Sequence, residues 1–361
     1  MKILVAIDSF KGSATSKELN EAAKIGILKA IPNAEVVTQT ISDGGEGTLD
    51  VLFDIFGGEL RRVETVDLLH RPLIAPYLLT EIEHIKTAII ETADIVGIDK
   101  IIPSPETITQ ADTYGLAAVL MAAKAQKAEQ IILTLGGSGT SDGGFGLLRG
   151  LGANPEIGDL SNLADFSGID IFGFADVNNL YAGEAGYANV FGKQKGGTEK
   201  ILARQALASQ EFVDKIKVKY GINLQNINGT GAAGGLGGAI TILGGSIQSG
   251  FESIAEFIKF DKLIEGCDLL ITGEGRMDSQ TINGKVASSV AKHGLKQNIP
   301  TVAICGGLDS ELREMEELLL ASFSIQTQPV PLKEAVKKES TLLNMTFVTT
   351  QIMKLFSNNY N

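Results

Sequence analysis

Unbroken apolar runs near both ends of the chain constrain its fold most strongly. The run KILVAI at residues 2–7 is followed at once by polar residues and then by a stretch with helical spacing, and the same order recurs after the runs near residues 268 and 301. Strands that are apolar on both faces are typical of parallel sheets covered by helices on both sides. The pattern therefore predicts an α/β fold built on a parallel sheet.

The middle of the chain follows a different pattern. Residues 61–94 contain short strand-like pieces separated by polar breaks, which indicate a meander, and a loop-rich, glycine-rich region continues to about residue 250. We therefore expect two domains. Residues 1–66 and 265–361 would form one five-stranded parallel domain, and residues 67–264 would form an inserted domain.

The composition narrows the class of function. The 361 residues are 44% hydrophobic, enough for more than one core, and the net charge of −12 argues against sequence-independent binding of nucleic acid. No apolar stretch is long enough to span a bilayer. The two cysteines and three histidines show no zinc-binding spacing. We expect a cytoplasmic protein that acts on small molecules, with neither a nucleic-acid nor a membrane partner.

Four polar loops follow predicted strands of the domain that the chain ends form. They are DSFKGS at 8–13, SDGGEGT at 42–48, TGEGRMDSQT at 272–281 and CGGLDS at 305–310. Open parallel sheets bind ligands beyond the carboxyl ends of their strands, at the point where the strand order reverses. In a flavodoxin-like order that point lies between the first and third strands. The four loops therefore predict a ligand site at one edge of the sheet.

The middle of the chain adds three glycine-rich clusters. They are LGGSGTSDGGFG at 135–146, VFGKQKGGT at 190–198 and NGTGAAGGLGG at 228–238. Such loops can surround an oxyanion, because successive N–H groups point inward with no Cβ in the way. The glycines at 229–234 could instead begin a helix that packs closely on a neighbour, and the fit of GTGAAG to GxGxxG is weak by itself. Oxyanion loops, carboxylates and single cations are together the groups that phosphoryl transfer needs.

Six of these motifs carry a family resemblance. AIDSFKGS, SDGGEGT, GGSGTSDGG, VFGKQKG, GTGAAGGLG and TGEGRMDSQTINGK occur in this order along nearly the whole chain, which resembles the type I glycerate kinase family of bacteria. The resemblance implies a kinase that uses ATP and Mg²⁺ to phosphorylate D-glycerate, giving 2-phosphoglycerate and ADP, with 3-phosphoglycerate as the alternative product. It also implies a flavodoxin-like domain built from both chain ends and an inserted, mixed α/β domain that is restriction-enzyme-like. A homodimer is an open alternative.

On this basis we expect glycerate in the cleft between the domains, with its carboxylate near Lys11, Arg276 or both. Asp278 or Asp8 would accept the hydroxyl proton. The remaining substrate contacts would come from Ser9, Asp43, Gly44 and Glu274. Asp43 or Asp176 would help to hold Mg²⁺. The ATP phosphates would lie on the glycine loops at 136–144 and 229–235, with Lys195 or Lys285 as the added cation. The loop residues that we expect at the phosphates are Gly136, Gly137, Ser138, Thr140, Gly229, Gly231 and Gly234.

Three alternatives from other classes stay open at this point. An NAD-dependent oxidoreductase would need the glycines at 229–234 to open a true βαβ unit. A binding protein without catalysis would hold glycerate and release no ADP. A nucleic-acid enzyme is suggested by the name of the inserted fold, and the net charge of −12 opposes it.

Overall fold

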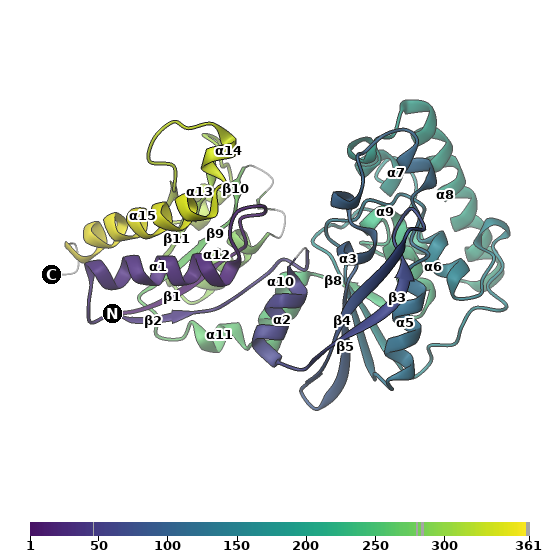
Figure 1. The fold of residues 1–361 in the computed structure, drawn as a ribbon, viewed down its shortest axis with the longest axis horizontal. Coiled ribbons are helices and arrows are strands. Elements are labelled where there is room, and N and C mark those ends of the chain that lie inside the picture. Colours follow the sequence, from purple (N-terminus) through teal and green to yellow (C-terminus); the bar gives the residue numbers. More distant parts are fainter. Residues whose placement is uncertain (46, 279–280, 283–284, 359–361) are drawn as a thin grey trace. The chain divides into compact units, whose positions relative to one another are not determined.

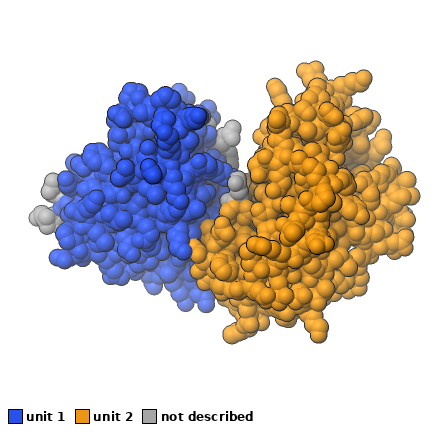
Figure 2. Space-filling view, in the orientation of Figure 1, with its two compact units in different colours: residues 1–43, 251–361 blue, residues 44–250 orange. Residues whose placement is uncertain are grey.

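The computed structural model describes residues 1–45, 47–278, 281–282 and 285–358. The chain divides into two compact units (Figure 2). Unit 1 consists of residues 1–43 and 251–361, and unit 2 consists of residues 44–250. Each unit is described below by itself.

A parallel sheet forms the centre of unit 1. In the described part of the chain this sheet has five strands in the order β13-β11-β9-β1-β2, which is the flavodoxin-like order expected from the sequence. The strands are β1 (Lys2–Ile7), β2 (Glu35–Thr38), β9 (Leu269–Gly273), β11 (Thr301–Cys305) and β13 (Ala321–Ser324). The short strands β10 (Arg276–Met277) and β12 (Gly307–Leu308) form a separate parallel pair.

Helices cover both faces of this sheet, as the unbroken apolar runs predict. The helices of unit 1 are α1 (Ser16–Ala30), α10 (Gly250–Phe257), α11 (Phe260–Leu263), α12 (Val286–Lys296), α13 (Met315–Leu318), α14 (Leu332–Ala335) and α15 (Lys338–Asn358). Ile3 and Val5 of β1 pack in one cluster with residues of α1 and α15, whereas Leu4 packs on the other face with α10, α11 and α12. Successive side chains of a strand point to opposite faces, so β1 must be apolar at every position. Figure 1 shows α1 and α15 side by side.

Unit 2 contains a mixed sheet. Its described residues form six strands in the order β3-β4-β5-β6-β7-β8, of which β3, β4 and β5 pair antiparallel and β5 to β8 pair parallel. The antiparallel part is the meander expected from the sequence. The strands are β3 (Glu59–Val66), β4 (Pro72–Ile82), β5 (Ile85–Glu91), β6 (Gln130–Thr134), β7 (Asp170–Phe174) and β8 (Ser246–Gln248).

Several helices of unit 2 lie in the region that the sequence pattern predicts to be loop-rich. The helices of unit 2 are α2 (Thr48–Phe56), α3 (Ala93–Val96), α4 (Thr107–Gln110), α5 (Leu116–Ala125), α6 (Phe145–Gly150), α7 (Tyr187–Phe191), α8 (Glu199–Tyr220) and α9 (Ala232–Ile242), with short 3-10 turns at Ile98–Lys100, Pro155–Ile157, Lys193–Lys195 and Leu224–Asn226. The 22-residue helix α8 lies in a region that we expected to be loop-rich. Few residues of this helix are buried, among them Phe212, Val213 and Ile216. Its apolar stripe is therefore narrow, which makes the helix hard to recognise from the sequence.

The limits of the compact units differ from the domain boundaries expected from the sequence. The first limit falls after residue 43, and the sequence pattern places it after residue 66. The second falls after residue 250, and the sequence pattern places it after residue 264. The first shift arises because β3 pairs with β4 along its whole length, from Glu59 to Val66. The second arises because Phe251 and Phe260 pack in the core of unit 1. Within the described residues, none of the helices combines the length and the apolar composition needed to cross a membrane.

Candidate active site

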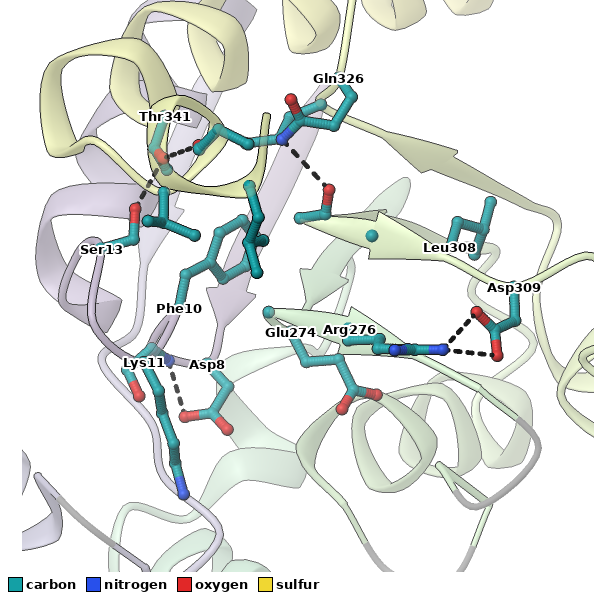
Figure 3. Close-up of a pocket in the computed structure, with 18 of the residues that line it drawn as sticks. Asp8, Phe10, Lys11, Ser13, Glu274, Arg276, Leu308, Asp309, Gln326 and Thr341 are labelled. Atoms are coloured by element: carbon teal, nitrogen blue, oxygen red, sulfur yellow. Dashed lines mark hydrogen bonds and ion pairs between the residues drawn. The ribbon is translucent and has the colours of Figure 1, made fainter. Parts of the chain in front are cut away.

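A pocket of about 790 Å³ opens at the carboxyl edge of the sheet in unit 1. Its walls come from the segments that follow β1, β9, β11 and β13 and from Thr341 of α15 (Figure 3). Asp43 also lines the pocket. Because β1 and β9 are neighbours in the sheet, the pocket includes the point where the strand order reverses. This is the place that the sequence predicts for a ligand.

Buried polar groups of α1 fix the loop that follows β1. The side chain of Asn20 accepts a hydrogen bond from Ile7 N at 2.9 Å, and the hydroxyl of Ser16 donates to Ile7 O at 2.6 Å. Thr15 and Glu18 form the capping box that the sequence predicts at the start of the helix. Replacing such a cap costs about 1 kcal/mol. The loop that carries Asp8 and Lys11 is therefore held at both ends.

Two ion pairs that differ in their exposure to solvent follow β9. Lys285 Nζ lies 3.1 Å from Glu274 Oε2, and only 8% of the Glu274 side chain is exposed. Arg276 Nη2 contacts both carboxylate oxygens of Asp309, at 3.1 and 3.3 Å, but 70% of the Arg276 side chain is exposed (Figure 3). An exposed pair of this kind contributes about 1 kcal/mol or less, so the arginine can exchange its partner for an anionic ligand at little cost.

Two carboxyl groups of this pocket, those of Asp8 and Glu274, hold their protons more tightly than ordinary carboxyls do. Desolvation, and then the negative charge of Asp43, raise the pKa of Asp8 well above its usual value, against the opposing effects of the Ser9 N–H and Lys11. Desolvation also raises the pKa of Glu274, which the charge of Lys285 opposes. Raised carboxyl pKa values of this origin are typical of groups that accept or donate protons in catalysis.

The second group of expected residues lies in unit 2, at the carboxyl end of β6. Lys195 is buried, and its Nζ donates to Ser138 Oγ at 3.0 Å and to Thr140 O at 2.6 Å. Burial lowers the pKa of Lys195 to about 8, and the negative charge of Asp142 opposes this shift. The structure thus joins the 136–140 loop to Lys195, which we expected as one phosphate site.

The glycines of the two long loops in unit 2 have an internal packing reason. Gly143 N–H donates to Gly234 O at 2.9 Å, and a Cβ on Gly234 would lie 2.1 Å from Thr140 O. A Cβ on Gly231 would lie 2.1 Å from Leu180 O. The two loops therefore contact each other directly, and their role in binding phosphate stays a prediction.

A glycine substitution tests this packing role. Gly234 has a φ of +67°, so Gly234→Ala would combine backbone strain with a collision at Thr140 O. We expect a loss of about 3 kcal/mol in the free energy of unfolding, measured by chemical denaturation. Gly244→Ala is the matched control, because its φ is +88° and nothing lies within 4 Å of its Cβ. Equal losses in the two variants would show that loop contact is not what requires glycine at 234.

The structure brings seven of the expected site residues into one pocket. Those that line the pocket of unit 1 are Asp8, Ser9, Lys11, Asp43, Glu274, Arg276 and Lys285. Asp278 follows β10 in the same unit but does not line the pocket, and its N–H donates to the hydroxyl of Thr281. Ser279, Gln280, Asn283 and Gly284 of the same motif, and Glu46 of SDGGEGT, lie outside the described residues.

The remaining expected residues belong to unit 2. These are Gly44, Gly136, Gly137, Ser138, Thr140, Asp176, Lys195, Gly229, Gly231 and Gly234. Asp176 follows β7, and its Oδ1 accepts hydrogen bonds from Ser249 Oγ at 3.0 Å and Gly250 N at 3.1 Å. Asp43 and Asp176, the two expected Mg²⁺ ligands, thus belong to different units. No group of three or more His, Cys, Asp or Glu side chains in the described part of the chain is arranged to hold a metal ion.

Two features of the structure were not expected from the sequence. The first is the apolar side of the pocket in unit 1, which the segment after β13 supplies between Ile325 and Val336. This segment follows the carboxyl end of a parallel strand, as the other loops of the pocket do, so the same rule could have identified it. The second is Glu91, a buried carboxyl at the end of β5 that accepts hydrogen bonds from Gly47 N at 2.7 Å and Leu49 N at 3.0 Å, at the start of α2.

Glu91 gives a prediction for the pH dependence of stability. Burial raises the pKa of Glu91 from 4.5 to about 7, so between these values the folded chain binds a proton that the unfolded chain has released. The contribution is fully present below pH 4.5 and is lost as the pH rises through 7. Denaturation at pH 4.5 and pH 8 should show that the wild type loses roughly 3 kcal/mol more stability than Glu91→Gln does. Glu64→Gln, at an exposed position of β3, serves as the control. Parallel losses in the wild type and Glu91→Gln would contradict the assignment.

Comparison with known proteins assigns this chain to a family. The model of the glycerate kinase family matches residues 3–357. A glycerate kinase from Bacillus cereus is 36% identical, and the alignment covers 96% of each chain; a glycerate 2-kinase from Escherichia coli is 31% identical over 93% of each. The crystal structure of a candidate glycerate kinase 2 from Salmonella typhimurium LT2 superposes with a TM-score of 0.82 at 29% identity, over 100% of this chain and 99% of that one. This chain therefore belongs to the glycerate kinase family of enzymes.

Proposed function

We propose that this protein transfers the γ-phosphoryl group of ATP to the 2-hydroxyl of D-glycerate, giving 2-phosphoglycerate and ADP. The family and the names of its relatives support glycerate as the substrate, and the name of the Escherichia coli relative, glycerate 2-kinase, favours the 2-position. The observation that carries the proposal is the pocket of unit 1, where carboxylates and cations converge at the switch point of the sheet. The match to the glycerate kinase family favours a kinase over the oxidoreductase, the binding protein and the nucleic-acid enzyme.

The residues of the pocket divide by charge. Asp8 accepts the proton of the glycerate hydroxyl, because its raised pKa brings it closer to the operating pH of a general base. Arg276 binds the glycerate carboxylate, since a guanidinium matches a planar carboxylate with two parallel hydrogen bonds. Lys11 and Lys285 neutralise the charge of the transferring phosphoryl group. Asp278, the other candidate for the base, lies outside the lining of the pocket.

Mg²⁺ fits the acidic side of the same pocket. Asp43 lines it, and the negative charge of Asp43 raises the pKa of Asp8, so a divalent cation there would relieve the repulsion between two acids. One or two carboxylates suffice for Mg²⁺ when phosphate oxygens and water complete its octahedron. When bound, the ion supplies charge neutralisation on the phosphate oxygens. The homodimer and the cytoplasmic location stay predictions.

The identity of the product tests the proposal. ADP release would be measured with D-glycerate, L-glycerate and tartronate, and the product would be examined by phosphorus NMR. We expect turnover with D-glycerate and a phosphorus doublet, because the phosphate of 2-phosphoglycerate couples to the single proton on C2. A triplet would assign the phosphate to C3 instead. The absence of ADP release with D-glycerate would contradict the proposed activity.

A further inference from the structure

The pocket of unit 1 has two chemically different sides. Figure 3 shows Asp8, Lys11 and Glu274 toward one side, Gln326 and Thr341 toward the other, and Phe10 between them. Apolar side chains of the segment that carries Gln326 also line the pocket; these are Ile325, Pro329, Val330, Leu332 and Val336. We call this segment the apolar side. The charged side has a place in the proposed reaction, whereas the apolar side does not.

Part of the apolar side is exposed in the structure. Val330 is 39% exposed, Val336 is 38% exposed and Leu332 is 78% exposed, although all three line the pocket. Water contact with such side chains is unfavourable, and an apolar ligand that covered them would remove that cost. Pockets that bind small organic ligands combine an apolar lining with a few polar groups in this way.

Glycerate cannot occupy this side. It carries a hydroxyl or a carboxylate on every carbon and has no apolar face to offer. The volume of about 790 Å³ lies in the range of pockets for ligands much larger than a three-carbon acid. Of the two substrates in the proposed reaction, the nucleotide alone has a flat, apolar ring.

The polar groups of this side suit a purine edge. Gln326 Nε2 donates to Gly306 O at 3.3 Å, which orients its amide at the pocket wall, and Gln328 supplies a second amide to the same lining. A glutamine amide offers one donor and one acceptor side by side, which is the pattern that pairs with N6 and N7 of adenine. A phosphate chain that runs from this side toward Lys11 and Lys285 would meet positive charge.

We propose that the apolar side of the unit 1 pocket binds the adenine ring of ATP, between the segment at 325–336 and Phe10. The proposal rests on the proposed function, which supplies the nucleotide as a substrate. It places the adenine in unit 1 and assigns Val330, Val336 and Gln326 to its recognition.

Direct binding measurements test this subsite. ADP and pyrophosphate would be titrated calorimetrically into the full-length protein. We expect ADP to bind the wild type at least tenfold more tightly than pyrophosphate. The double substitution Val330→Ser with Val336→Ser should weaken ADP binding about tenfold and leave pyrophosphate binding within twofold of the wild type. The matched control is Leu320→Ser with Leu343→Ser, which removes two exposed apolar side chains of the same unit that do not line the pocket.

A second variant, which fills the apolar side of the pocket, tests the proposal if the double serine variant does not fold. Ala335→Trp adds a large ring to the pocket lining, and Lys333→Trp adds the same ring to α14 at an exposed position that does not line the pocket. Ala335→Trp should lose the preference for ADP over pyrophosphate, and Lys333→Trp should keep it. Unchanged ADP affinity in both pocket variants, or a raised KM for the hydroxy acid alone, would overturn the proposal. The titrations need no turnover. Tighter binding of ADP than of pyrophosphate, without phosphorylation of glycerate, would therefore reject the proposed function and leave this inference standing.

Discussion

Asp8→Asn is expected to lower kcat for D-glycerate by 10²- to 10⁴-fold, with a much smaller change in KM for ATP. The asparagine keeps the shape of the side chain and its place beside Ser9 N, but it cannot accept the proton of the attacking hydroxyl. The measurement is steady-state ADP release with each substrate varied in turn. Glu316→Gln, which removes one carboxylate at an exposed position on α13, is the control for the change in charge.

The pH profile separates a base from a merely structural carboxyl. Desolvation raises the pKa of Asp8, so kcat/KM of the wild type for D-glycerate should rise with pH through a limb above the ordinary carboxyl range. That limb should be absent from the residual activity of Asp8→Asn. If Asp8→Asn retained turnover within threefold while Asp278→Asn lost it, Asp278 would be the base.

Lys285→Met is expected to lower kcat by 10²- to 10³-fold. The substitution removes one cation from the charged side of the pocket, and the loss of a single preorganised charge donor at a reacting oxygen has an effect of this size. The methionine also leaves Glu274 without the partner that lies 3.1 Å away, so the free energy of unfolding should fall by about 1 to 3 kcal/mol. Turnover and chemical denaturation would be measured on the same preparation.

A double substitution separates the two effects of Lys285. In Glu274→Gln with Lys285→Met, the buried carboxylate is neutralised together with the cation, so most of the lost stability should return. The low kcat should stay, because the charge on the phosphoryl group is still not neutralised. Recovery of turnover along with stability would show that Lys285 acts only by holding the fold of the site.

The sequence was most informative where local pattern and tertiary structure agree. KILVAI had to be a strand with both faces covered, and Thr15 and Glu18 marked the start of the following helix. Helix α8 was harder to recognise, because its buried residues form a narrow stripe in a polar segment between glycine loops. The limits of the compact units depended on the pairing of β3 with β4, which local composition does not reveal.

The charged rim of the candidate site was also predictable, and its apolar side was not. Asp8 and Glu274 directly follow parallel strands, so their meeting at one sheet edge follows from topology alone. The exposed side chains of Val330 and Val336 instead depend on the path of the segment after β13, whose residues are only partly buried. The glycines at 229–234 fitted both phosphate binding and close packing, and coordinates were needed to show that Gly143 and Gly234 contact each other.

The most direct test of this account is a crystal structure of the protein with MgADP and D-glycerate. We expect both ligands to contact the pocket of unit 1, with the glycerate hydroxyl within hydrogen-bond distance of Asp8 and the β-phosphate of ADP within reach of Lys11 or Lys285. Ligands bound with none of these three side chains in contact would show that phosphoryl transfer takes place elsewhere in the molecule.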